Sequence, residues 1–186
     1  MKVFYTTSLR NVAKNRDRLE TIYVLIEKLG HTNLDKVLFN IPDSKKFYDG
    51  LHKEKLSHYN RMIACIKKAD VVLLEVSTQS LSMGFILHTA LGMNKPVIAL
   101  HTSGKSPFFV QGIEDKRLRV QEYDLETIEK VLTEALEFAQ ETFDVRFDFF
   151  ISPEISMHLD TLARENRVPK SVYLRSLIET DMAKEN

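Results

Sequence analysis

The sequence contains a single cysteine, no tryptophan and no excess of either charge. Lys plus Arg and Asp plus Glu number 26 each among 186 residues, so no overall field favours nucleic acid or an anionic membrane. No run of about 18 apolar residues occurs, which argues against a membrane-spanning helix. Cys65 has no partner for an internal disulfide and fits a reducing cytoplasm. Because the first residues turn polar too soon for a secretory signal, we expect a cytoplasmic protein.

Metal and cofactor motifs are also missing. The six histidines show neither an i,i+4 pair nor an acidic partner at ligand spacing. The stretch GKS at 104–106 lacks the earlier glycine and the following helix of a phosphate-binding P-loop. We therefore expect no metal ion and no cofactor. The charged residues of 42–58 are interpreted as a solvated loop and helix start, with a lid over a binding site as the alternative.

Apolar segments of strand length alternate with segments of helical spacing in the first part of the chain. Strands are predicted at 2–5, 36–41, 71–76, 95–100 and 118–123, and helices lie between them and at 125–142. The run VVLLEV at 71–76 is typical of a central parallel strand that is buried on both faces. This order predicts an α/β protein with a flavodoxin-like, doubly wound, five-stranded parallel sheet.

Two hydroxyl-rich turns follow the first and third predicted strands. In the strand order 2-1-3-4-5, the crevice that binds ligands opens beyond these two strands. The turns carry Arg10 and a set of hydroxyl side chains, which are Thr7, Ser8, Ser77, Thr78, Ser80 and Ser82. Hydroxyls, backbone N–H groups and one arginine suit a sugar or a phosphate. The alternative is ordinary turn and helix-cap chemistry, which uses the same residue types.

The last part of the chain breaks this pattern. Residues 145–151 alternate as a strand, Ser152, Pro153 and Glu154 start a helix, and a second helix follows from Lys170. We predict a nucleotide-binding domain at 1–142 and a small module at 143–186. A lone strand needs a partner for its edges, and the same strand of a second chain would supply it. We therefore expect a homodimer or tetramer that assembles through this module.

Residues 1 to about 140 resemble the nucleoside 2-deoxyribosyltransferase superfamily, especially the 2'-deoxynucleoside 5'-monophosphate N-glycosidases. The segments KVFYTTSLR, ADVVLLEVSTQSLSMGFILHTALGMNKPVIAL and SPFFVQG carry the resemblance. It implies that residues 7–10 and Ser80 hold the phosphate of a nucleotide and that Glu75 lies near the ribose. The predicted ligand-binding set is Tyr5, Thr7, Ser8, Leu9, Arg10, Glu75, Ser80, Ser82, Gly84 and Ile86.

The resemblance fails at the catalytic positions. Ile86 stands where the family has its nucleophilic glutamate, and Met62 stands where it has an aspartate. The family's reaction needs a carboxylate at contact distance from the anomeric carbon. We therefore expect a nucleotide-binding relative without catalysis. The alternative is an active nucleotide N-glycosidase or deoxyribosyltransferase that uses a relocated carboxylate such as Glu75. The sequence predicts neither which base the ligand carries nor whether its sugar is ribose or deoxyribose.

Residues 145 to about 184 resemble the ribbon-helix-helix family of small repressors. The resemblance implies a strand pair across a dimer axis whose outward residues, here Arg146, Asp148 and Phe150, read bases. The start of the second helix, Lys170 and Ser171, would meet a phosphate. Residues 145–186 hold six basic and seven acidic side chains, so DNA binding is disfavoured and dimerisation is favoured. A nucleotide-sensing, DNA-binding regulator is the second alternative.

Overall fold

The computed structural model describes residues 1–36, 50–141, 150–166, 168–182 and 184. The chain divides into two compact units, Met1–Val145 and Arg146–Asn186. The first unit holds a five-stranded, all-parallel sheet in the order β2-β1-β3-β4-β5. The predicted α/β class with a flavodoxin-like doubly wound sheet is therefore confirmed.

The central strands of the sheet are β1 (Lys2–Thr7), β3 (Val71–Glu75) and β4 (Val97–His101), with β5 (Leu118–Glu122) at one edge. Every residue of β3 and β4 is buried, as expected for parallel strands that are covered on both faces. The register pairs Thr7 with Glu75 and Glu75 with Leu100. The carboxyl ends of β1, β3 and β4 therefore lie side by side.

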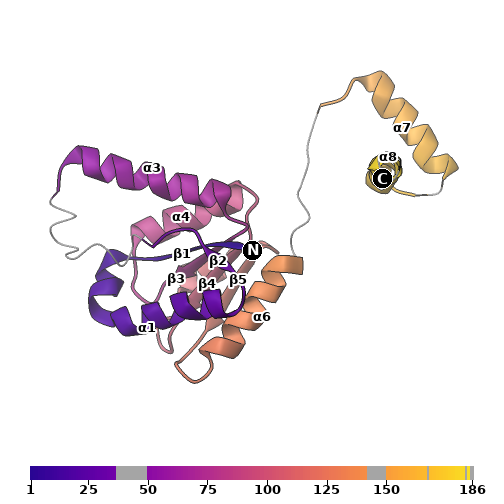
Figure 1. Cartoon of the computed structure of the whole chain (residues 1–186). Coiled ribbons are helices and arrows are strands. Elements are labelled where there is room, and N and C mark those ends of the chain that lie inside the picture. The colour runs from indigo at the N-terminus through magenta and orange to yellow at the C-terminus, as the bar shows by residue number, and fades with distance from the viewer. Residues whose placement is uncertain (37–49, 142–149, 167, 183, 185–186) are drawn as a thin grey trace. The chain divides into compact units, whose positions relative to one another are not determined.

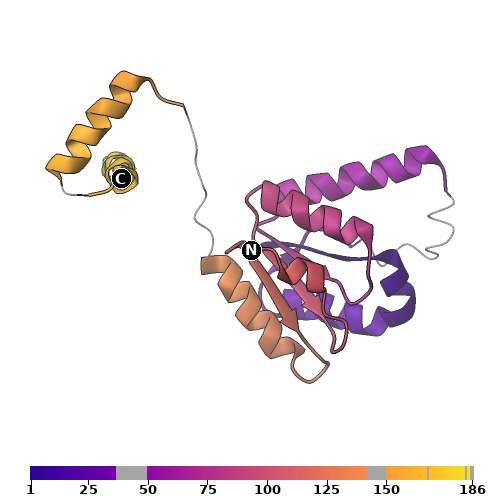
Figure 2. The same ribbon diagram turned by 180° about the vertical axis from the view of Figure 1, so that it is seen from behind.

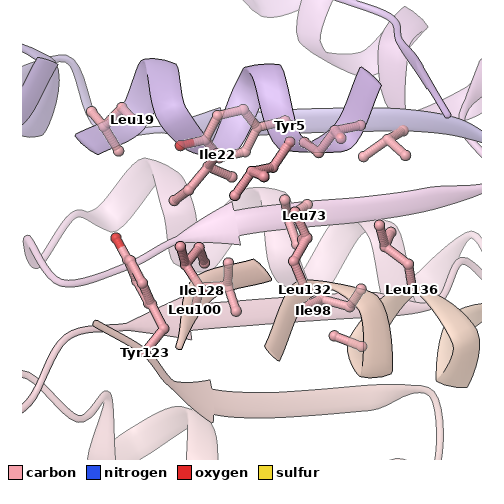
Figure 3. Packing of buried hydrophobic residues seen from close by; sticks show 14 of the residues in the cluster. Tyr5, Leu19, Ile22, Leu73, Ile98, Leu100, Tyr123, Ile128, Leu132 and Leu136 are labelled. Carbon is pink, nitrogen blue, oxygen red and sulfur yellow. The ribbon is translucent and has the colours of Figure 1, made fainter. Parts of the chain in front are cut away.

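Two pairs of helices cover the two faces of the sheet (Figures 1 and 2). Helices α1 (Leu9–Lys28) and α6 (Ile128–Glu141) pack on one face, and α3 (His52–Lys68) and α4 (Leu81–Gly92) pack on the other. Alternate strand residues serve the two faces, since Val71 and Leu73 join the first cluster while Val72 and Leu74 join the second. Figure 3 shows Leu73 packed among side chains of α1 and α6 in the first cluster.

The second strand lies earlier than the sequence pattern predicts. Helix α1 ends in a Schellman turn, in which Gly30 has φ of 82° and the His31 N–H donates to the Ile26 carbonyl over 3.1 Å. The chain then pairs with β1 at once through β2 (Thr32–Asn33). Lys36 is not in a strand, and the rest of the predicted strand at 36–41 lies outside the described residues.

Smaller shifts occur at other predicted ends. Helix α6 begins at Ile128 rather than at 125, because the Asp124 carboxylate accepts hydrogen bonds from the N–H groups of Glu126 (2.9 Å) and Thr127 (2.7 Å). The Thr127 hydroxyl donates to the same carboxylate over 2.8 Å and is the main cause of the lowered pKa of Asp124, to which the two N–H bonds add. The loop after β4 contains one short helix, α5 (Phe108–Gln111), which leaves Phe108 and Phe109 exposed.

The second unit contains α7 (Pro153–Glu165) and α8 (Lys170–Met182) in its described part. Ser152 caps α7, since its Oγ accepts a hydrogen bond from the Ile155 N–H over 3.3 Å. Leu159 and Ala163 are buried, whereas Ile155, Val172 and Ile178 are exposed. Most of the predicted strand at 145–151 lies outside the described residues, and Phe150 and Ile151 are not in a strand.

Candidate functional site

The carboxyl ends of β1 and β3 open into a pocket of about 570 Å³, which lies within the usual range for small-molecule sites. The order β2-β1-β3 places the pocket at the topological switch point, where doubly wound sheets bind ligands. Helices α3 and α4 complete its walls. The lining residues are Thr6, Thr7, Ser8, Leu9, Asp35, Lys55, His58, Tyr59, Arg61, Met62, Ile63, Ser80, Leu81, Ser82, Met83, Phe85 and Ile86.

The turn after β1 supplies Thr7, Ser8 and Leu9 to the pocket. Ser8 caps α1, because its Oγ accepts a hydrogen bond from the Asn11 N–H over 3.3 Å. The Thr7 hydroxyl donates to the main-chain carbonyl of Glu75 over 2.7 Å. Both hydroxyls therefore fix the turn, and the residues that carry them line the pocket. Arg10 is exposed and is not among the residues that line the pocket.

The turn after β3 supplies Ser80, at the N-cap of α4, and Ser82. Ser80 does not cap its helix with its side chain, so the first N–H groups of α4 receive no hydrogen bond from it. Neither α1 nor α4 has an acidic residue in its first turn. Two positive helix ends therefore meet at the pocket without a local carboxylate to oppose them, which favours an anion. Gly84 is exposed and does not line the pocket.

The floor of the pocket is apolar. Met62, Met83 and Ile86 are nearly fully buried, and Leu9 and Ile63 adjoin them in the lining. Ile86 and Met62 thus lie in the same pocket, although they are 24 positions apart in the chain. Among the described lining residues, Asp35 is the single carboxylate. The floor side chains themselves are aliphatic groups and thioethers, so none of them supplies a carboxylate nucleophile or a proton donor.

Glu75 lies outside the pocket, on the other face of the sheet. Its side chain is fully buried, and its carboxylate accepts hydrogen bonds from Thr7 (3.3 Å), Tyr123 (3.1 Å), Asn11 and Ser77. Arg18 Nη2 adds an ion-pair contact at 4.0 Å. These partners occupy both oxygens, so Glu75 joins the turn after β1 to the turn after β3. The role of Glu75 as a relocated catalytic group stays a prediction, and its place favours a structural role instead.

Two tyrosines on the same face of the sheet, Tyr5 and Tyr123 (Figure 3), interact with this carboxylate. Burial raises the pKa of Tyr5 well above its ordinary value, and nearby Tyr123 and Glu75 add to the rise. Burial also raises the pKa of Tyr123, with the charge of Glu75 as the next cause. Tyr5 was predicted to bind the ligand, but it does not line the pocket. Its hydroxyl has no hydrogen-bond partner among the described residues.

A second polar group in the pocket comes from α3 and from the segment after β2. Arg61 Nη2 donates to His58 Nδ1 over 2.9 Å, and Arg61 Nε lies 3.5 Å from Asp35 Oδ2. Burial and the neighbouring Arg61 charge lower the pKa of His58. The sequence interpretation missed these residues. The spacing of Lys55, His58–Tyr59 and Met62 indicated one face of the helix that lines the pocket, but that pattern includes neither Arg61 nor Asp35.

The predicted nucleic-acid residues belong to the second unit. Arg146 and Asp148 lie outside the described residues, while Phe150 and Ser171 are exposed. Lys170 Nζ forms an ion pair with Asp160 Oδ1 at 2.8 Å, which offsets its charge at the start of α8. In the described part of the chain, no His, Cys, Asp and Glu side chains group in a way that would bind a metal ion. No described helix is long and apolar enough to cross a membrane.

Comparisons with known proteins found two relatives with a stated activity. One is a candidate 2'-deoxynucleoside 5'-phosphate N-hydrolase of Syntrophotalea carbinolica, 28% identical over 125 residues, which cover 67% of this chain and 85% of that protein. The other is the 5-hydroxymethyl-dUMP N-hydrolase of Danio rerio, 28% identical over 142 residues, which cover 74% of this chain and 96% of that protein. No protein-family model matches the chain. The two similarities support the interpretation of this protein as a relative of the nucleotide N-glycosidases.

Proposed function

We propose that the first unit binds a nucleoside monophosphate in the pocket between the turns after β1 and β3. The observation that carries this proposal is that two helix N-termini and Ser8, Ser80 and Ser82 line the same pocket. Backbone N–H groups and hydroxyls at helix starts stabilise phosphate oxygens. The similarity to two nucleotide N-hydrolases supports a nucleotide as the phosphate-bearing ligand.

Titration calorimetry of the full chain with deoxynucleoside monophosphates and with the matching nucleosides tests this proposal. We expect the monophosphates to bind at least about tenfold more tightly, because charge-assisted bonds to the phosphate are worth about 1.5–3 kcal/mol. Equal affinity for the nucleosides would contradict a phosphate bound at these two helix N-termini. Absence of binding for every nucleotide would contradict the proposed function as a whole.

We further propose that the bound nucleotide is not cleaved. Departure of the base leaves positive charge on the anomeric carbon, and a neighbouring carboxylate must take up that charge. Ile86 and Met62, which occupy the family's two acidic positions by the resemblance, are buried and apolar. Loss of a covalent nucleophile leaves the smaller rate gain that binding and electrostatics provide.

A second candidate function is an active N-glycosidase in which another carboxylate replaces the missing glutamate. One observation favours Asp35 over Glu75 for that role, because Asp35 lines the pocket and Glu75 does not. If the protein releases free base and Asp35→Asn abolishes the release, this candidate replaces the first. If Glu75→Gln abolishes it at unchanged stability, the relocated group is Glu75.

We propose that the second unit, Arg146–Asn186, assembles the protein as a ribbon-helix-helix dimer. Support comes from the exposed Ile155, Val172, Leu177 and Ile178, whose apolar surface two helices alone do not bury. Light scattering of Ile155→Glu and Ile178→Glu should show dissociation to monomers. The control is Leu125→Glu, an apolar position of the first unit that is also exposed. An unchanged subunit count in both test variants would contradict assembly through these helices.

A further inference from the structure

Asn11 is a buried polar residue that acts on the pocket only through its neighbours. It lies in the first turn of α1, is completely buried and is not among the residues that line the pocket. Its N–H donates to the main-chain carbonyl of Ser8 over 2.8 Å, and its side-chain Nδ2 donates to Thr7 Oγ1 over 2.9 Å. Because Thr7 and Ser8 both line the pocket, Asn11 supports the turn after β1 without touching a ligand itself.

The side chain of Asn11 uses its full capacity for hydrogen bonds, which is two N–H donors and two acceptor lone pairs. Its Nδ2 donates to Thr7 Oγ1 and to the Glu75 carboxylate. Its Oδ1 accepts from Asn15 Nδ2 over 2.8 Å and from Thr78 Oγ1 over 3.1 Å. Neither residue of similar size reproduces this pattern, since aspartate lacks the donors and would face Glu75 with a second charge, while leucine forms none of the four bonds.

These bonds connect the two turns that border the pocket. Thr78 belongs to the turn after β3, two positions before Ser80, which is the N-cap residue of α4. The bond from Thr78 to Asn11 therefore joins the start of α1 directly to the segment that leads into α4. Glu75 makes a second connection at the end of β3. Because a buried and fully satisfied polar network is rigid, the starts of α1 and α4 are held in one relative arrangement.

A break in α1 separates its first residues from the rest of the helix. Asn15 has φ of −137° and ψ of 33°, which are not helical values, although helical residues flank it on both sides. Its side chain donates back to Asn11 Oδ1. The first residues of α1 are therefore oriented by the bonds of Asn11, and not by a continuous helix alone.

We infer that Asn11 is a positioning residue for the phosphate site and that Thr78 is its partner in the turn after β3. This inference rests on the proposed binding of a nucleoside monophosphate. The first N–H groups of α1 and α4 bind one phosphate only while both helix starts point at it, and a displacement of more than about 0.5 Å weakens such a site. Loss of the connection should therefore weaken phosphate recognition more than the binding of a nucleoside, which brings no phosphate to these N–H groups.

The test measures affinities of the full chain by titration calorimetry for the four common deoxynucleoside monophosphates and for the matching nucleosides. The ratio of the two dissociation constants gives the phosphate preference of each variant. Thr78→Val removes the hydroxyl at nearly constant shape, Thr78→Ser retains it, and Asn11→Leu removes all four side-chain bonds. The matched control is Tyr123→Phe, which removes another buried hydrogen bond to Glu75 but none between the two turns, and Tyr123 does not line the pocket.

We expect Thr78→Val to reduce the phosphate preference about threefold and Asn11→Leu to reduce it about tenfold. Thr78→Ser and Tyr123→Phe should keep the preference of the wild type, although Tyr123→Phe should lower the urea concentration at the midpoint of unfolding. A partial loss of folded protein reduces the affinities for nucleotide and nucleoside alike, so their ratio reports the geometry of the phosphate site and not stability.

A wild-type preference in both Thr78→Val and Asn11→Leu would overturn the inference and leave the proposed function intact. An equal loss of preference in Tyr123→Phe would also overturn it, because the effect would then belong to the whole network. If Asn11→Leu does not fold, the comparison of Thr78→Val with Thr78→Ser decides. Failure of every monophosphate to bind the wild-type protein would overturn the proposed function and this inference together.

Discussion

At the carboxyl edge of the sheet, the face under α1 and α6 buries a carboxylate, whereas the face under α3 and α4 opens a pocket with an apolar floor. Glu75 is fully buried on the first face and receives hydrogen bonds from four side chains. On the second face Ile86 and Met62 occupy the positions where the resemblance places carboxylates. On one face an acidic residue therefore links the two turns by hydrogen bonds. On the other face apolar residues at the corresponding positions make the floor of the pocket apolar.

The comparison shows that the role of a side chain at this edge depends on the face of the sheet to which it points as much as on its residue type. A buried carboxylate with a full set of donors is held in one geometry and excluded from solvent. It can order the two turns that border the pocket, because Thr7 and Asn11 come from one turn and Ser77 comes from the other. It does not reach the space where a ligand would lie.

The largest expected effect follows from removing the buried carboxylate. Glu75→Ala leaves the donors of Asn11, Ser77 and Tyr123 without their acceptor in a buried place. We expect the free energy of unfolding to fall by about 2–4 kcal/mol, measured by urea denaturation. Glu75→Gln keeps the shape and one acceptor oxygen and should cost less. Equal stability of the alanine variant and the wild type would show that the network contributes nothing to folding.

The next effect tests the apolar character of the pocket floor. Ile86→Glu places a carboxyl beside Met62 and Met83, where burial should raise its pKa above the unfolded value of about 4.3. The protonated form is then favoured by folding, so stability is highest below that pH and falls by about 1–3 kcal/mol as the pH rises through the folded pKa. Ile86→Gln, which does not titrate, is the control. Parallel pH profiles for the two variants would mean that the floor is well hydrated.

The smallest effect distinguishes the two turns. Ser80 lines the pocket at the start of α4, whereas Arg10 is exposed and outside the lining. We expect Ser80→Ala to weaken nucleoside monophosphate binding by about 1 kcal/mol. Arg10→Ala should weaken it less, through the loss of a distant, screened charge. A larger loss for Arg10→Ala in calorimetry would place the phosphate on the outer side of α1.

Much of the fold was predictable because its signals are local. The five strands alternate with helices, and the run VVLLEV at 71–76, in which Glu75 is the single polar residue, identified the central strand. The face of Glu75 was predictable too. Strand residues alternate between faces, so Glu75 points to the side of Leu73, away from Ile86 on α4. The resemblance, which matches residues in sequence, carried no information on this alternation.

Two features were beyond the sequence pattern. The position of β2 depends on where the chain leaves the Schellman turn at Gly30, which apolar spacing does not record. The second polar group of the pocket joins Asp35 to His58 and Arg61, more than 20 positions later, and the charged residues between them resemble an ordinary solvated surface. Long-range pairs of this kind become visible only when the tertiary fold brings α3 over the end of β1.

The measurement that tests the central claim most directly is base release by the wild-type protein. The full chain is incubated with each deoxynucleoside monophosphate, and chromatography follows the free base. Because the residues at the two acidic positions of the family are Ile86 and Met62, we predict no release above the rate without protein. Release of base that disappears in Asp35→Asn or in Glu75→Gln would contradict the claim and identify the carboxylate that performs the cleavage.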